Sequence, residues 1–322
     1  MVNTRFSRFA RGVLGYNLAV ILWGAYVRAT GSGAGCGAHW PLCNGEIIPR
    51  APQVETVVEF THRVTSGLVL VLAVALVVWA WRAYPPRHTV RFGAATALVF
   101  TLTEALVGAG LVLFEMVADN TSIERAFWMM GHLANTFILL AALTLTALWS
   151  SQEEPRGLIW NSRLGTPLVL GVVAMIVLGA SGAVTALGDT LFPVSSLAEG
   201  IRQDFSPTAH FLVRLRIFHP IIAVIVGAYL AGMGWWMRAQ LPERAVERLS
   251  LALAGLFAAQ LVLGVINVLL LAPVWMQLVH LLFADLVWIC LVLLGGYVLG
   301  QPQPAASPVD HPVHHRVKQA SQ

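Results

Sequence analysis

Eight long apolar runs divide the chain, and they constrain its fold more than any other feature. A helix crosses the hydrocarbon core of a bilayer with about 20 mainly apolar residues. Hydrophobic residues make up 57% of the 322 residues and charged residues only 11%, which excludes an ordinary soluble domain. The sequence therefore predicts an all-α membrane protein with eight transmembrane helices, at roughly 11–30, 55–81, 93–114, 125–149, 164–186, 209–237, 249–271 and 275–299.

Arginines predict the orientation of these runs. They gather before the first run and after the second, fourth and sixth: Arg5, Arg8, Arg11, Arg82, Arg87, Arg91, Arg156, Arg163, Arg238, Arg244 and Arg248. Because cytoplasmic loops are rich in Lys and Arg, both termini are predicted to be cytoplasmic, in an inner (plasma) membrane. Arg28 near the end of the first run favours a retained helix over a cleaved signal peptide. The net charge of +4 reflects the same excess of arginine in the predicted cytoplasmic loops, so no nucleic-acid partner is inferred.

The two halves of the chain repeat similar signals in the same order. Leu14-Gly15, Ser32-Gly33-Ala34, His62, Glu104 and His132 are matched in turn by Leu164-Gly165, Ser181-Gly182-Ala183, His219, Gln260 and His280. Such a repeat predicts two fused, pseudo-symmetric four-helix bundles with the same orientation. Their predicted bounds are 1–150 and 151–300, and a disordered cytoplasmic tail rich in Pro, Ser and His follows at 301–322.

Each even-numbered run carries one histidine: His62, His132, His219 and His280. All four are predicted about five to ten residues past the outer face, which is roughly 8 to 15 Å deep. A single intramembrane histidine is more often a hydrogen-bond donor between helices. Two at equal depth in each half instead favour a pair of axial ligands to a haem iron. Zinc or copper would require further Cys, His or carboxylate ligands.

Five arginines near the predicted outer boundary are candidate partners of haem propionates: Arg28, Arg63, Arg125, Arg214 and Arg216. Long basic side chains that merely reach the membrane interface are the alternative interpretation.

The halves differ at the residue three positions before the first histidine of each pair. Glu59 precedes His62, whereas Arg216 precedes His219. A spacing of three places Glu59 on the same helical face as His62. A carboxylate beside a haem could act as acid or base at the porphyrin edge. An ion pair with Arg63, four residues later, is the structural alternative.

Several other polar residues lie within the apolar runs. Glu104 is replaced by Gln260 in the second half, so we interpret it as a polar contact between helices. Asn135 and Asp285 could orient the histidine ligands or make other polar contacts. Cys290 is predicted to be a packing residue.

Two cysteines, Cys36 and Cys43, lie in the first predicted outer loop. An oxidising outer compartment permits a disulfide between them. Two free thiols or a redox couple are the alternatives.

Taken together, five motifs resemble the bacterial haem A synthase family over roughly residues 10 to 300. They are the loop TGSGAGCGAHWPLCNGEIIP, EFTHR, GHLANT, FHP and LVHLLFADL. The resemblance implies oxidation of the C8 methyl group of haem O to a formyl group by two successive hydroxylations. It also implies a disulfide between Cys36 and Cys43. His39 stands where many relatives carry an acidic residue, so it receives no role.

The resemblance also implies roles for the histidines and for Glu59. The first half would hold the substrate haem O through His62 and His132, with Glu59 as the catalytic residue. The second half would hold haem b through His219 and His280. The implied partners are membrane lipid, haem O, an unidentified electron donor and a haem O synthase that supplies the substrate.

Two other functions fit an eight-helix histidine protein. One is a di-haem cytochrome b that exchanges electrons with quinone, and the other is a haem transporter. Glu59, which has no carboxylate counterpart in the second half, and the cysteine loop favour the enzyme. Extraction of the bound pigment separates the three, because only the enzyme yields a formyl-bearing haem.

Overall fold

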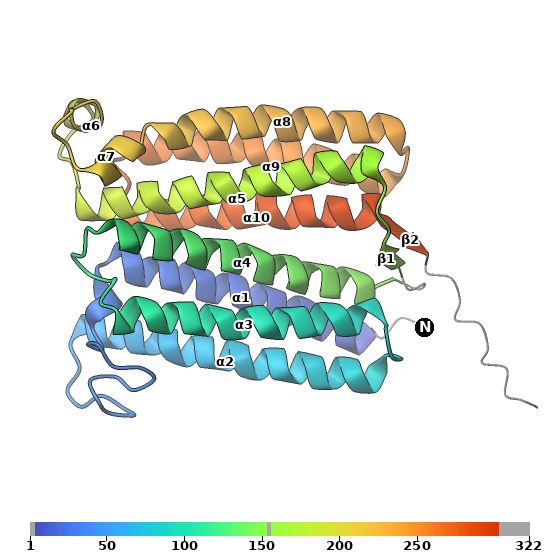
Figure 1. Cartoon of the computed structure of the whole chain (residues 1–322), viewed down its shortest axis with the longest axis horizontal. Coiled ribbons are helices and arrows are strands. Elements are labelled where there is room, and N and C mark those ends of the chain that lie inside the picture. Colours follow the sequence, from blue (N-terminus) through green and yellow to red (C-terminus); the bar gives the residue numbers. More distant parts are fainter. Residues whose placement is uncertain (1–3, 153–155, 303–322) are drawn as a thin grey trace, which may run out of the picture.

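The computed structural model describes residues 4–152 and 156–302, and long helices dominate this part of the chain (Figure 1). The long helices are α1 Thr4–Ala29, α2 Val54–Ala83, α3 Thr89–Leu113, α4 Ile123–Ser150, α5 Ser162–Leu191, α8 Phe218–Gln240, α9 Arg244–Leu269 and α10 Val274–Val298. The short elements are η1 Ser32–Ala34, α6 Leu197–Asp204, α7 Phe211–Leu215, and the antiparallel strands β1 Arg156–Leu158 and β2 Gly300–Pro302. The predicted all-α class is confirmed.

Within the described residues, seven helical segments are long and apolar enough to cross a membrane, with α7 and α8 taken together as Phe211–Gln240. Helix α1 is of similar length but less apolar, because polar residues such as Arg11 and Asn17 interrupt it. The coarse expectation of a multi-pass helical membrane protein therefore agrees with the structure.

The long helices form two groups that lie side by side (Figure 1). One group contains α1 to α4, and the other contains α5, α8, α9 and α10. Helices α4 and α10 meet between the groups. Residues 30–53 and 192–217 form the end of the molecule at the left in Figure 1, and this end contains the disulfide.

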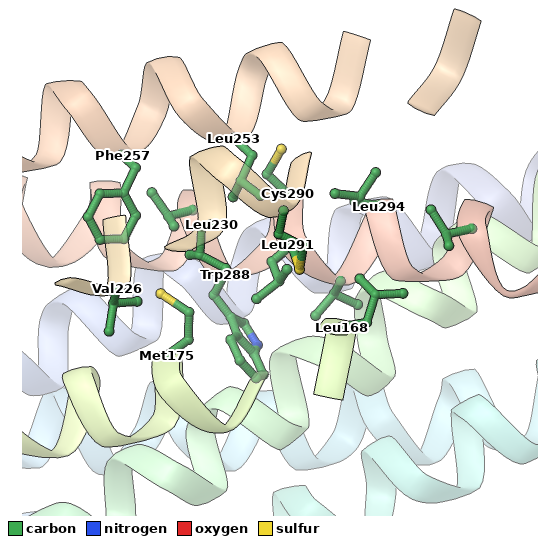
Figure 2. Close-up of a cluster of buried hydrophobic side chains, with 14 of the residues drawn as sticks. Leu168, Met175, Val226, Leu230, Leu253, Phe257, Trp288, Cys290, Leu291 and Leu294 are labelled. Carbon is green, nitrogen blue, oxygen red and sulfur yellow. The ribbon is translucent and has the colours of Figure 1, made fainter. Parts of the chain in front are cut away.

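An aromatic pair joins the two groups. Phe137 of α4 and Trp288 of α10 stack with ring centroids 4.6 Å apart, and the Trp288 indole N–H donates to the Phe137 carbonyl oxygen at 2.7 Å. Trp288 belongs to the cluster of buried side chains shown in Figure 2, which also includes Cys290, the predicted packing residue. Because lipid is as apolar as these side chains, close packing and hydrogen bonds, rather than removal from water, hold such helices together.

The sixth predicted run is broken. Helix α7 ends at Leu215 and α8 begins at Phe218, so the run predicted at 209–237 is two helices. Pro220 explains the break, because it has no N–H to donate to the carbonyl of Arg216 and its ring crowds that carbonyl.

Helix α6 was not predicted. Ser196 caps it by accepting a hydrogen bond from the Glu199 N–H, and the Glu199 carboxylate reaches back to the Ser195 N–H. This reciprocal arrangement is typical of a helix N-terminus, and its Ser-x-x-Glu spacing was the signal that could have revealed α6.

One pairing in the predicted repeat is wrong. Ser32-Gly33-Ala34 forms η1 beyond the end of α1, whereas Ser181-Gly182-Ala183 lies inside α5. The contacts described below make Gly24, not Gly33, the counterpart of Gly182. The predicted tail is also shifted, since residues 301 and 302 lie in β2; residues 303–322, with their histidines, are outside the described residues.

Candidate functional site

A cavity of about 1560 Å³ lies among the long helices of both groups. All four intramembrane histidines line it, together with mainly apolar side chains from α1 to α5 and α8 to α10. Pockets for one small ligand are usually about 300 to 1,000 Å³, so this cavity has room for more than one. The sequence predicted two histidine pairs but not that they share one cavity.

His219 of α8 and His280 of α10 face each other. Their ring centroids are 6.5 Å apart and their planes are inclined at 78°. An imidazole nitrogen binds a first-row metal at about 2.0 to 2.1 Å, so two rings on opposite sides of one iron have centres roughly 6.3 Å apart. The separation of this pair fits two axial ligands of one iron.

The neighbours of His219 support the same interpretation. The His219 Nδ1 lies 3.0 Å from the Ser181 hydroxyl, which leaves Nε2 for a ligand. Metal-binding imidazoles commonly use their second nitrogen in this way. A Cβ atom at Gly182 would come within 3.0 Å of the His219 ring, so this position favours glycine.

His280 is held by α9. The Gln260 amide nitrogen lies 3.1 Å from His280 Nε2 and donates to the His280 carbonyl oxygen at 2.9 Å. The His280 Nδ1 is buried and has no hydrogen-bond partner among the described residues. Gly264 lies against this ring, where a Cβ atom would be 3.2 Å away.

The first half repeats these contacts. A Cβ atom at Gly24 of α1 would come within 2.9 Å of the His62 ring, as at Gly182 and His219. The His132 Nδ1 lies 3.3 Å from the Glu104 carboxylate, as His280 lies against Gln260. Glu104 also accepts hydrogen bonds from Thr136 and Asn135, so the predicted contact between helices is present. The sequence did not predict its contact with His132, which joins residues of two different helices.

Asn135 and Asp285 have different surroundings. Asn135 donates to Glu104 and to the Phe100 carbonyl oxygen, so it helps to position the carboxylate beside His132. Asp285 is fully buried and lines the cavity. Neither of its carboxylate oxygens has a hydrogen-bond partner among the described residues.

Glu59 is 3% exposed, and both of its carboxylate oxygens accept hydrogen bonds. Oε1 accepts from the Arg63 guanidinium at 2.5 and 3.1 Å, and Oε2 accepts from the Cys36 backbone N–H at 2.8 Å. The ion pair named as the structural alternative is therefore present. Glu59 also lines the cavity, so its carboxylate lies between the cysteine loop and the His62 side of the site.

The cysteine loop is closed by a disulfide. Cys36 and Cys43 are bonded, with their Cα atoms 4.4 Å apart, and both are buried. Arg63 donates to the carbonyl oxygens of His39 and Leu42, each at 2.6 Å. The loop is therefore fastened to α2 by the side chains that flank His62.

Two of the five candidate arginines are paired with carboxylates. Arg63 is bound to Glu59, and Arg216 lies 3.0 Å from both Asp189 and Asp204. Asp204 lies outside the membrane-spanning segments, where burial raises its pKa and the Arg216 charge opposes that rise. Because carboxylates balance the charges of Arg63 and Arg216, these two arginines would attract a bound anion less strongly.

Arg28 and Arg125 have only neutral hydrogen-bond partners among the described residues, and both line the cavity. Arg28 donates to the Ala186 carbonyl, the Thr190 hydroxyl and the Gln277 amide oxygen, which joins α1 to α5 and α10. Arg125 donates to two backbone carbonyls, and its buried Nε has no partner within the same described ranges. Arg214 is exposed and does not line the cavity.

Among the described residues, no three His, Cys, Asp or Glu side chains gather closely enough to hold a metal ion by themselves. Each histidine pair would thus need further ligands from the bound molecule, and a porphyrin supplies four nitrogens. The fold and the site define a class: multi-pass helical membrane proteins with paired histidines inside the membrane-spanning part.

The chain belongs to the COX15-CtaA family, described as cytochrome oxidase assembly protein, whose model matches residues 7–292. It is 57% identical over 296 residues to a Thermus thermophilus protein named protoheme IX farnesyltransferase, a match that covers 92% of this chain and 49% of that protein. It is 40% identical over 232 residues to a heme A synthase of Exiguobacterium sibiricum, covering 71% and 73% of the two chains. The chain thus spans about half the length of the Thermus relative.

Proposed function

We propose that the chain is a haem A synthase that oxidises the C8 methyl group of haem O to a formyl group. The observation that carries this proposal is the difference between two otherwise similar histidine pairs. Glu59 stands beside the first pair, and Arg216, bound to two carboxylates, takes its position beside the second. Family membership and the heme A synthase relative support the same activity.

The proposed organisation has eight transmembrane helices in two pseudo-symmetric bundles, residues 1–150 and 151–300, with both termini on the cytoplasmic side of the plasma membrane. Helix α1 would be the eighth span. The recurring contacts of Gly24 with His62 and of Gly182 with His219 support the pseudo-symmetry.

The substrate haem O would lie in the first bundle, with His62 and His132 as iron ligands. Haem b would lie in the second, between His219 and His280, where the ring separation supports it. Haem b held by His219 and His280 would supply electron transfer.

Glu59 would hold or move protons at the methyl group. Two successive hydroxylations, with an oxygen source and an oxidant still to be identified, give an alcohol and then a geminal diol, which loses water to form the aldehyde. Loss of water removes a proton from one hydroxyl group and adds a proton to the departing hydroxyl group, and a carboxylate in a site of low dielectric could carry this proton. The hydrogen bonds from Arg63 and Cys36 fix its position, and the apolar lining would exclude bulk water.

The reaction needs partners that the chain does not contain. An electron donor, still to be identified, would serve haem b, and lipid would deliver the farnesylated substrate. A haem O synthase is the proposed supplier, since the Thermus relative carries the name protoheme IX farnesyltransferase while this chain matches only about half of it.

The proposed activity is tested by expressing the protein in membranes that contain haem O and identifying the extracted haems by chromatography. A haem with a formyl group is expected only when the protein is present. Bound but unmodified haem would instead support a di-haem cytochrome b, and flux of unaltered haem across vesicles would support a transporter.

The surroundings of the arginines yield a prediction about propionate binding. Replacing Arg125 by Gln should release haem O about tenfold faster or more, because a hydrogen bond between charged groups contributes about 1.5 to 3 kcal/mol. The rate is measured by transfer to apomyoglobin, followed by chromatography of the remaining haems. Arg214→Gln, at an exposed position outside the cavity, is the control. Equal release rates in the two variants would remove Arg125 from the propionate site.

A further inference from the structure

Helix α6 has an apolar face that no part of the described protein buries. Leu197 and Ile201 of α6, and Phe205 directly after its last residue, follow one another at intervals of four, so they lie on one side of this segment. Ile201 is 52% exposed and Phe205 is 72% exposed, and none of the eight residues of α6 is buried. A helix this short is not stable in isolation, so something else must stabilise it.

The apolar face of α6 is turned to the cavity. Leu197, Ile201 and Phe205 all line it, as do Ile221 and Val224 of α8. These two residues of α8 are also exposed, and they lie within two turns of His219. The exposed apolar residues of α6 therefore line the same cavity as the second histidine pair.

One cluster of charges fastens α6 at its C-terminal end. Asp204, the last residue of the helix, lies 3.0 Å from Arg216, and Arg216 also reaches Asp189 of α5. The N-terminal end is capped locally, by Ser196 just before the helix and by Glu199 in its first turn. Helix α6, near α7 in Figure 1, thus has a tether at its C-terminal end, and its apolar residues line the cavity.

In the first half of the molecule, a different segment lines the cavity. There the cysteine loop contributes Trp40 and Pro41. A disulfide closes that loop, and Glu59 and Arg63 fasten it to α2. The cysteine loop is therefore closed by a disulfide and fastened to α2, whereas α6 is fastened by Asp204 and Arg216, and its apolar residues remain exposed.

We propose that α6 is part of the haem b binding site: the Leu197, Ile201 and Phe205 face packs on the porphyrin held between His219 and His280. A porphyrin is the occupant that the site favours, because it presents a broad apolar edge next to the imidazole pair. The inference rests on the proposed function for the identity of the ligand. It assigns these three residues a contact with the cofactor.

The test uses haem release from the purified holoprotein. Phe205→Ser should transfer haem b to apomyoglobin about tenfold faster or more than the unchanged protein, since an apolar contact of this size contributes about 1.5 to 3 kcal/mol. Phe205→Leu should restore slow release. The control is Ile48→Ser, at an equally exposed residue of the cysteine loop that does not line the cavity.

Proteolysis supplies a second readout. Arg202 is an exposed trypsin site within α6, and Arg50 is an exposed site in the cysteine loop. Bound haem should slow cleavage after Arg202 and leave cleavage after Arg50 unchanged. The role of α6 would be overturned if haem b is bound but is released from Phe205→Ser no faster than from Ile48→Ser, and if cleavage after Arg202 is equal with and without haem. The proposed function would be unaffected by that result. Absence of bound haem would overturn the proposed function as well.

Discussion

Replacing Glu59 by Ala is expected to lower haem A production by about 100-fold or more, because positioned acids and bases contribute about 10² to 10⁴ in rate. Haem should remain bound, since the histidines are untouched, and haem O or its alcohol should accumulate. The haems are extracted from membranes and quantified by chromatography. Full haem A production by this variant would refute the catalytic role of Glu59.

The contacts of Glu59 require a second variant. Glu59 holds the Cys36 N–H and the Arg63 guanidinium, so Ala also removes the anchor of the cysteine loop. Glu59→Gln keeps an oxygen for the Cys36 N–H but cannot accept a proton as a carboxylate does. If Gln is as inactive as Ala, proton chemistry explains the loss; if Gln is largely active, anchoring does. Glu55→Ala, at an exposed position on the same helix, is the matched control.

The second large effect is expected at the His219 and His280 pair. Replacing either by Ala should remove haem b, so that haem per chain falls from about two to about one and haem A production stops. Because one ligand is of little use without the other, the double variant should lose no more haem than either single variant. Haem content is measured against protein concentration in purified samples.

The control for this prediction is His210→Ala. His210 caps α7, stacks on Phe192 and does not line the cavity. The His210→Ala variant should retain both haems. Unchanged haem content in His219→Ala and His280→Ala would show that this pair does not bind the iron.

The sequence predicted the elements whose signals are local. Apolar length gave the long helices, and the histidines were recognised because each stands in an apolar run where an ionisable group is costly. The Glu59 and Arg63 ion pair followed from a spacing of four on one helix. The cysteine pair was recognised as a potential disulfide from its place in one short loop.

Features that depend on packing between distant segments were not predictable in this way. The shared cavity needs the positions of α4 and α10 between the two groups. The contact of Glu104 with His132 joins residues 28 apart on different helices. The Ser32-Gly33-Ala34 pairing failed because a match of three small residues carries no information on which glycine faces an imidazole; the contacts of Gly24 and Gly182 do.

Helix α6 was missed for a different reason. Its eight residues are mixed in polarity and form no long apolar run, so its signal was the Ser-x-x-Glu spacing at its start rather than apolar length. The structure shows what the sequence did not: the apolar residues of α6 line the same cavity as His219 and His280.

The account depends on imidazole pairs that bind an iron porphyrin from both sides, and electron paramagnetic resonance of the oxidised, purified protein tests this most directly. The inclined His219 and His280 rings predict a strongly anisotropic low-spin ferric signal, which should vanish when either residue is replaced. A protein that binds haem but gives only high-spin iron, or that keeps this signal without His219 and His280, would contradict the account.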